Sequence, residues 1–349
     1  MKKMSSRRRP KTRTRATIAD VARRAGVSTA TVSRVINQTV PVGSDTVAQV
    51  RRAIAELDYR PSSAARVLAS RRTNSIGLLI SQISDDFFSA LLRGIEAKAR
   101  EEGYSLLIYS TQGREAGAED FCYPLGEHNT DGVLVFVNSL PEAELFHFHQ
   151  IGFPVVLIHR SAPLGLDIPC VTIENKHGAR MLIDHLIEEH NYGRIAFLTG
   201  EEGQEDSAWR EMGYRESLAA HGIPFDPDLV AAGGFNRTIA QDAIGRWLAD
   251  GLEFEAIMAG DDEAAIGVLS ALNRAGKRVP EDVAVVGFDD VYVSQYLNPP
   301  LTTVRAPTEQ VGREAVGQLV KLIQGGGLAP IGLLPVELVV RRSCGCAYD

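Results

Sequence analysis

The stretch TIADVARRAGVSTATVSRVINQ, residues 17–38, decides the fold at the N-terminal end of the chain. Apolar residues recur at helical spacing on both sides of a single glycine, Gly26. Thr17 is a favourable N-cap for a helix over 18–25, and Ser28 for a second helix over 29–36. Gly26 can adopt the left-handed backbone that ends the first helix. The stretch therefore predicts a helix, a tight turn and a helix.

Three further segments complete the N-terminal region. Ser44 is expected to cap a third helix that runs to about Leu57 and shares one small core with the first two. Pro61 should then interrupt the chain, and residues 64–69 predict a helix of one or two turns that is marginal alone in water. Residues 1–15 contain eight Lys or Arg, no acid and no apolar periodicity, and they predict a basic flexible arm.

Charge is divided unevenly along the 349 residues. Residues 1–72 contain 17 Lys or Arg against four acids, a net +13, while the remaining 277 residues contain 20 basic and 40 acidic side chains, a net −20. The overall charge of −7 hides this division. A cationic end on an anionic body indicates a polyanionic partner for the N-terminal region, such as nucleic acid.

From residue 75 onward, short apolar runs of β type alternate with amphipathic helices. Buried parallel strands joined by crossover helices produce this pattern. A body of about 270 residues exceeds one typical domain, so we expect two α/β lobes side by side. The expected strands are 76–80, 106–109, 133–137, 155–158, 195–199, 256–259 and 283–288, and the expected helices are 90–102, 179–190, 209–221, 239–250 and 264–275.

Composition excludes several classes of protein. The chain is 44% apolar and 23% charged, which is typical of a globular protein and not of a disordered or fibrous one. Four cysteines are too few for the disulfide framework of a small secreted domain. We find neither an export signal nor a run of about 18 apolar residues that could span a membrane. The sequence therefore predicts a cytoplasmic protein without a membrane partner.

Five stretches of this sequence resemble a known family. TIADVARRAGVSTATVSRVINQ and VRRAIAELDYRPSSAARVLASRRTNSIGLLI (50–80) closely resemble the lactose/galactose-repressor (LacI/GalR) family of bacterial transcription regulators. VVGFDD at 285–290, LTTVRAP at 301–307 and VVRRSCGC at 339–346 are also similar to that family. The resemblance implies an all-α helix-turn-helix head and an α/β two-lobed body like that of periplasmic binding proteins, with parallel sheets. It also implies a homodimeric repressor that binds a palindromic DNA operator near the nucleoid and responds to a small effector, a sugar by analogy.

On this interpretation the chain has four parts. They are a basic flexible arm at 1–15, a helix-turn-helix domain at 16–60, a hinge helix and linker at 61–74, and an effector-binding and dimerisation body at 75–349. Within the body we expect lobe 1 at about 75–173 and 305–330, and lobe 2 at about 174–304 and 331–342.

The second helix is the expected DNA-contacting element. A helix of this size fits the major groove, where base edges are exposed. Family positions that contact bases match Thr29, Ala30 and Arg34, and Arg34 is the expected main contact because its guanidinium can pair bidentately with guanine. The alternative is that Arg34 is only a solvated helix charge. Small polar side chains nearby suit phosphate oxygens, and they are Ser28, Thr31, Ser33 and Asn37.

The segment 64–69 resembles the hinge helix of the family, which forms on the operator and inserts a leucine into the minor groove. The matching residue is Leu68, and the basic Arg66 and Arg71 lie beside it. An inserted apolar side chain partly unstacks the bases and bends the duplex. The bent duplex then contacts a larger area of the protein surface. The alternative is that Leu68 packs beneath the lobes.

A ligand site is expected between the two lobes. Open α/β sheets bind ligands at the carboxyl ends of their strands, and two lobes gather such ends around one cleft. The side chains expected there combine carboxylates, an arginine, an imidazole and aromatic rings, which suits a sugar or another polyol. They are Phe87, Phe88, His159, Asp206, Arg210, Phe235, Asp261 and Asp289.

The family resemblance supports part of this set and leaves the effector open. Arg210, Asp261 and Asp289 match effector-contacting positions, and Phe235 falls where the family uses an aromatic residue. His159, however, stands where several sugar-responsive members have an acid, and a glutamine frequent in the family is replaced by alanine at 306.

Metal sites, cofactors and catalysis are not predicted. The acids at 261–263 open a helix, where they are typical partners of its dipole, and Cys344 and Cys346 lack a second ligand pair at zinc-finger spacing. No nucleotide-binding, hydrolase or metalloprotease motif occurs. Two alternatives to a regulator stay open. One is a solute-binding protein outside the cytoplasm, and the other is a sugar-processing enzyme with Asp289 and His159 as acid and base.

Overall fold

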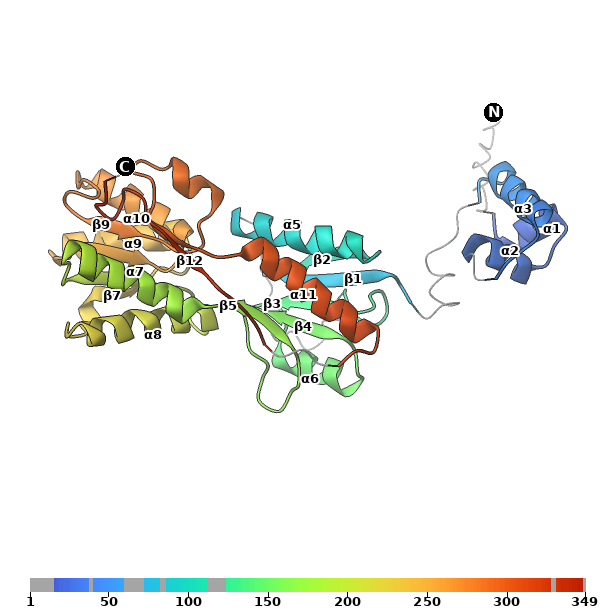
Figure 1. Ribbon diagram of the computed structural model, residues 1–349, viewed down its shortest axis with the longest axis horizontal. Coiled ribbons are helices and arrows are strands. Elements are labelled where there is room, and N and C mark those ends of the chain that lie inside the picture. Colours follow the sequence, from blue (N-terminus) through green and yellow to red (C-terminus); the bar gives the residue numbers. More distant parts are fainter. Residues whose placement is uncertain are drawn as a thin grey trace, which may run out of the picture. The chain divides into compact units, whose positions relative to one another are not determined.

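The computed structural model describes residues 16–37, 40–59, 72–81, 86–111, 124–327 and 331–347. The chain divides into two compact units, Met1–Thr73 and Asn74–Asp349 (Figure 1). The predicted arm lies outside the described residues, as do Arg66 and Leu68 of the predicted hinge helix.

The described residues of the first unit contain three helices, α1 (Ile18–Ala25), α2 (Thr29–Asn37) and α3 (Ser44–Glu56). Thr17 Oγ1 accepts a hydrogen bond from the backbone N–H of Asp20, whose carboxylate accepts one from the N–H of Thr17. This reciprocal cap fixes the start of α1. Gly26, with φ 68°, ends α1 in the left-handed conformation, as predicted. The Ser28 hydroxyl then caps α2 by accepting from the N–H of Thr31 at 3.1 Å.

The inner faces of these helices make one small core. Val21, Val32 and Val50, one from each helix, are fully buried. The start of α3 differs from the prediction, because Gly43 occupies the N-cap position without a side-chain bond and Ser44 is the first helical residue. The helix-turn-helix with a bracing third helix is otherwise as the apolar spacing predicts.

The second unit contains two parallel sheets. In the first sheet the strand order is β11-β5-β4-β3-β1-β2, with every neighbouring pair parallel. These strands are β1 (Ser75–Ile80), β2 (Ser105–Ser110), β3 (Val133–Phe136), β4 (Val155–Ile158), β5 (Cys170–Ile173) and β11 (Gly332–Leu334). Helices α5 (Asp86–Glu101) and α11 (Thr308–Ile323) pack against each other on one side of this sheet, and α6 (Glu142–Gln150) lies on the other (Figure 1).

The second sheet has the strand order β7-β6-β8-β9, again all parallel. Its strands are β6 (Ile195–Thr199), β7 (Val230–Ala232), β8 (Ala256–Ala259) and β9 (Ala284–Val286). Helices α7 (Asn175–His190) and α8 (Glu205–Ala220) pack together on one face, and α9 (Arg237–Ala249) and α10 (Asp262–Arg274) on the other. Short 3-10 helices η1 (Pro227–Leu229) and η2 (Tyr292–Tyr296) complete this lobe.

The chain passes between the lobes three times. The first passage is at Glu174, between β5 and α7. The other two are strands β10 (Thr303–Arg305) and β12 (Glu337–Val339), which pair with each other in antiparallel fashion. The Asp290 carboxylate accepts hydrogen bonds from Arg305 and Arg341 at 2.8 and 2.6 Å, and so joins both passages to lobe 2.

The boundary predicted at residue 331 is therefore misplaced. β11 pairs with β5 in the first sheet, so lobe 1 extends at least to Leu334. The short run at 332–334 has no distinctive pattern, and the pairing that assigns it to lobe 1 is made with a strand some 160 residues earlier. Among the helices of the described residues, none is long and apolar enough to cross a membrane.

Candidate functional site

A cavity of about 200 Å³ lies between the lobes, at the carboxyl ends of their strands. Lobe 1 contributes aromatic side chains, and lobe 2 contributes most of the charged and polar groups. Seven of the eight residues predicted for a ligand site line it, namely Phe87, Phe88, Asp206, Arg210, Phe235, Asp261 and Asp289. The structure therefore brings these strand-end side chains together, and their role in binding a ligand stays a prediction.

Arg210 is the central cation of the cavity. It lies on α8, is 3% exposed, and donates hydrogen bonds to Asn175 Oδ1 at 2.8 Å, to the carbonyl oxygen of Gly260 at 2.6 Å and to Asp289 Oδ1 at 3.1 Å. The guanidinium carbon also lies 3.7 Å from the centre of the Phe288 ring. These contacts fix the plane of the guanidinium. Within the described chain they use three of its five N–H groups, which leaves donors for a ligand hydroxyl.

Two buried carboxyl groups beside Arg210 hold their protons more tightly than usual. Burial raises the pKa of Asp261 well above its ordinary value, and the neighbouring Asp289 carboxyl raises it further. Burial also raises the pKa of Asp289, although Arg210 opposes this. Carboxyl groups of this kind can donate as well as accept hydrogen bonds, which suits a ligand whose hydroxyl groups do both.

His159 lies behind the cavity, in contact with Asp206. Its Nδ1 is 2.8 Å from Asp206 Oδ2 without the alignment of a hydrogen bond, and neither ring nitrogen has a hydrogen-bond partner among the described residues. The imidazole is 2% exposed and lies against the rings of Phe87 and Phe136. Burial raises the pKa of Asp206, but His159, Arg210 and Asn175 outweigh it and lower the pKa below its usual value. His159 therefore contributes to the cavity through Asp206, and it directly lines an adjoining space of about 190 Å³.

Several residues around these spaces have strained backbone. Val137, His159, Phe235 and Asp289 have φ of 44°, 56°, 49° and 101°, a region that side chains other than glycine rarely adopt. Such conformations persist where the surrounding structure holds them, and they cluster at ligand sites. Their position at four strand ends supports a binding role for the cavity.

Several residues that line the cavity were not predicted from the sequence. Phe136, Glu201, Gln204 and Asn236 also line the cavity, and Asn175 orients Arg210. Phe136 lies one residue before the end of the predicted strand 133–137, so its position near a strand end could have indicated it. Asn175 was missed because the α7 periodicity suggested a helix that begins at 179, whereas the helix begins one turn earlier.

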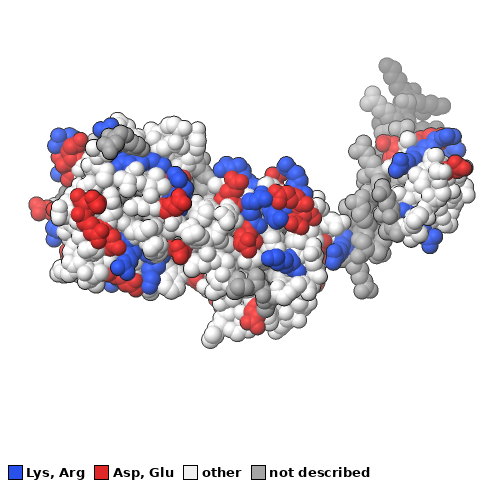
Figure 2. All heavy atoms as spheres, in the orientation of Figure 1, with Lys and Arg blue, Asp and Glu red and all other residues white. Residues whose placement is uncertain are grey.

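The helix-turn-helix presents the predicted DNA-contacting residues together. Thr29, Ala30 and Arg34 are exposed on one face of α2, while Val32 and Val35 are buried on the other. Basic side chains are visible on this unit in Figure 2.

The small polar residues predicted to contact phosphate are in varied settings. The Ser28 and Thr31 hydroxyls hydrogen-bond each other at 2.9 Å, so part of their capacity is used in the cap. Ser33 is half-buried, and the side chain of Asn37 lies outside the description. Their contacts with DNA stay a prediction.

A helix-turn-helix joined to a two-lobed body with a polar cavity defines a ligand-responsive DNA-binding regulator. Residues 17–62 match the family described as bacterial regulatory proteins, lacI family, and residues 183–344 match a periplasmic binding protein-like domain. The chain is 34% identical over 327 residues to the HTH-type transcriptional regulator GalR of Escherichia coli (strain K12), with 94% of this chain and 95% of GalR covered. The chain belongs to the LacI family of bacterial transcription regulators.

Solved structures agree with this assignment. A complex of the transcriptional regulator CelR with cellobiose is 32% identical with a TM-score of 0.68, and the match covers 94% of this chain and 100% of that one. A lac repressor dimer bound to operator and the anti-inducer ONPF is 26% identical with a TM-score of 0.82, and the match covers 95% and 99% of the two chains.

Proposed function

We propose that the protein is a repressor that binds a palindromic DNA operator as a homodimer and is controlled by a sugar bound between its lobes. The observation that supports the sugar most directly is the buried Arg210 with Asp206, Asp261 and Asp289, facing aromatic rings of lobe 1. Charged groups bind hydroxyl groups in fixed directions, and aromatic rings pack on the C–H faces of a sugar. The cellobiose bound to CelR is consistent with a carbohydrate ligand.

The head is proposed to bind DNA through α2 in the major groove. Arg34 contacts guanine, Thr29 and Ala30 contact neighbouring base edges, and hydroxyl groups at the start of α2 contact phosphates. Arg66 and Leu68 lie outside the described residues. We propose that Arg66 contacts the DNA at the operator centre and that Leu68 inserts into the minor groove there. Two heads on a symmetric dimer would account for a palindromic site.

A surface of lobe 1 supports dimerisation. Strand β2 is at the edge of the first sheet, and its Leu107 and Ile108 are 37% and 43% exposed. Exposed apolar side chains on an edge strand promote association with another chain unless they are covered. A second copy of the protein would cover them.

Control by the ligand is proposed to act through the angle between the lobes. A ligand that binds one angle more tightly shifts the population toward it, and a tenfold change in operator affinity needs about 1.4 kcal/mol of such preference. The cavity lies between the lobes, so its occupancy and the lobe angle are linked directly.

We propose that the ligand is bound and released unchanged, in a cytoplasmic protein associated with the nucleoid. A sugar-processing enzyme would need Asp289 and His159 as acid and base. In the structure Asp289 is ion-paired with Arg210, and His159 contacts Asp206. Recovery of an intact ligand after prolonged incubation supports this view, and any turnover product contradicts it.

Two measurements test the proposal. Selection from a pool of random duplexes should enrich a palindrome, and loss of any preference over random DNA would refute the repressor function. A thermal-shift screen of sugars should then yield a ligand that also changes operator affinity, since a ligand at 100 times its Kd adds about 2.7 kcal/mol to stability. A stabilising ligand that leaves operator affinity unchanged would contradict its role as effector.

A further inference from the structure

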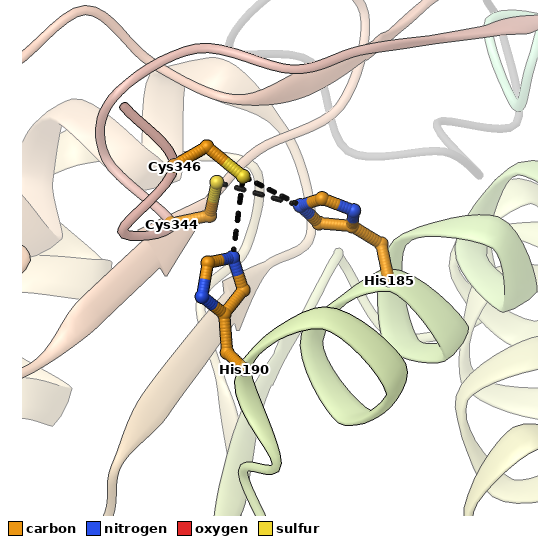
Figure 3. Close-up of side chains that lie close together, drawn as sticks. All are labelled: His185, His190, Cys344 and Cys346. Atoms are coloured by element: carbon orange, nitrogen blue, oxygen red, sulfur yellow. Dashed lines mark hydrogen bonds between the residues drawn. The ribbon is translucent and has the colours of Figure 1, made fainter. Parts of the chain in front are cut away.

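Four side chains outside the cavity and the DNA-contacting surface converge at the far end of lobe 2. His185 and His190 come from the last turns of α7, and Cys344 and Cys346 from the C-terminal segment (Figure 3). Their ligand-type atoms all lie within 4.8 Å of one another. Cys344 and Cys346 lack a second ligand pair nearby in the sequence, and the fold supplies that pair from α7.

The distances match those around a tetrahedral zinc ion. His185 Nε2 lies 3.5 Å from Cys344 Sγ and 3.6 Å from Cys346 Sγ, and His190 Nε2 lies 3.4 Å from Cys346 Sγ. Zinc bonds of about 2.3 Å to sulfur and 2.0–2.1 Å to nitrogen place neighbouring ligand atoms about 3.6 Å apart at tetrahedral angles. Three of the four nitrogen–sulfur edges of the site are therefore already close to this length.

Gly345, between the two cysteines, allows the cysteine side chains and His190 to come close together. Gly345 has φ 110°, and a Cβ atom there would lie 3.2 Å from the His190 ring. Glycine thus allows both a left-handed turn and the close approach of the imidazole. The His190 ring also stacks on Tyr192 at 5.4 Å, which limits its orientation.

Burial allows both retention and entry of an ion. Cys344 is fully buried, and its sulfur accepts a hydrogen bond of 3.1 Å from the Thr302 hydroxyl. His185, His190 and Cys346 are partly exposed. An ion can therefore enter from the solvent side and meet a fixed sulfur on the inner side.

We propose that His185, His190, Cys344 and Cys346 bind one Zn²⁺ ion in a structural, four-coordinate site. Two sulfur and two nitrogen ligands in a tetrahedron are typical of zinc, and calcium or magnesium would require oxygen ligands. Each coordinating thiol releases its proton to solvent, and two thiolates balance the charge of the ion. The ion fastens the C-terminal segment to α7.

This site is separate from the ligand cavity. Asn175 and His190 are the first and last residues of α7, and 15 residues of helix span about 22 Å. Loss of zinc therefore leaves the residues of the cavity in place.

The test uses reduced, metal-free, full-length protein. Titration against a chromogenic zinc chelator should show one tightly bound Zn²⁺ per chain. Co²⁺ should produce thiolate-to-cobalt charge transfer and the intense visible bands of a tetrahedral complex. Cys346→Ser and His190→Ala should each weaken zinc binding by at least about 100-fold, the upper end of what loss of an outer-shell partner causes.

Matched controls are His149→Ala, an exposed histidine of α6, and Cys170→Ala, a cysteine of lobe 1. Both should retain the zinc affinity of the unmodified protein. Zinc should also raise the thermal unfolding midpoint of the unmodified protein and not that of Cys346→Ser. The proposal is overturned if the unmodified protein fails to compete with the chelator, if its cobalt complex is octahedral, or if both ligand variants bind zinc as well as the controls.

Discussion

Arg210 and Asp289 form a buried ion pair of 3.1 Å in which the side chains are 4% and 8% exposed. Asp206 and Asp261 lie on the same cavity, so one guanidinium faces three carboxyl groups. Burial raises the pKa values of Asp261 and Asp289, and Arg210 opposes this rise at both carboxyl groups. Arg210 is therefore the cation that opposes the accumulation of negative charge in the cavity.

Replacement of Arg210 by alanine should remove the response to the effector and destabilise lobe 2. Removal of one partner of a buried ion pair leaves the other unpaired, which costs about 3–5 kcal/mol. We expect a correspondingly lower free energy of unfolding in urea, with operator binding retained below the transition. Arg180→Ala, which removes a half-exposed arginine of α7, is the control and should change little. A variant that still responds fully would exclude Arg210 from the site.

Stability should fall as the pH rises toward neutrality, because of Asp262. Burial raises its pKa to about 7, although the Ser294 and Thr303 hydroxyls favour the ionised form. The unfolded value is about 3.9, so the folded chain keeps a proton that the unfolded chain has lost. The contribution of this proton to the free energy of unfolding is complete below a pH of about 4. It is lost as the pH rises through 7, by up to about 1.4 kcal/mol per pH unit.

Urea melts at several pH values between 5 and 8 measure this slope. Asp262→Asn cannot ionise and should have a shallower slope, whereas Asp242→Asn, an exposed residue of α9, should not differ from the unmodified protein. Burial raises the pKa values of Asp261 and Asp289 as well. Part of the fall in stability with rising pH should therefore remain in Asp262→Asn. Equal slopes for the two variants would contradict the assignment to Asp262.

Gly200→Ala should weaken effector binding. A Cβ atom at Gly200 would lie 2.2 Å from the ring of Phe235, which must therefore shift within the cavity it lines. The effector-induced thermal shift should decrease. Gly245→Ala is the control, because the residue is helical and, beyond its chain neighbours and its own helix backbone, no described atom lies within 4 Å of the added Cβ. It should keep the thermal shift and gain roughly 0.5–1 kcal/mol of stability.

Arg34→Ala should weaken binding to the selected operator by about 1–3 kcal/mol and leave binding to random duplex nearly unchanged. Fluorescence anisotropy on both DNAs measures the difference. Arg52→Ala, an exposed arginine of α3, should not change the preference for the operator. Equal losses on the two DNAs would show that Arg34 contacts phosphate and not a base.

Local patterns predicted the helices of the head and seven of the strands in the described residues, but not the buried strand β5. Thr17, Gly26 and Ser28 act through contacts within a few residues, so their roles follow from spacing alone. The ligand cavity was also predictable, because the carboxyl ends of parallel strands meet at one edge of each sheet. Phe87 and Asp289 could be placed at this cavity from the order of the strands that precede them along the chain.

Contacts between distant segments were not predictable in this way. β11 belongs to lobe 1 only because it pairs with β5, and the spacing of Cys344 and Cys346 gives no sign of His185 and His190. Short elements such as α6 have too few residues for the spacing of their apolar side chains to indicate the type of secondary structure. These features depend on the global fold, which a local pattern does not contain.

The pairing of β10 with β12 limits how the body can deform. Two of the three connections between lobes share a hydrogen-bonded ladder, and Asp290 clamps both through Arg305 and Arg341. They cannot flex as separate hinges. Because the two connections are hydrogen-bonded to each other, we expect the lobes to move mainly by rotation about the β10–β12 ribbon. A compound bound between the lobes is thus expected to select one rotation of the lobes and not to separate them.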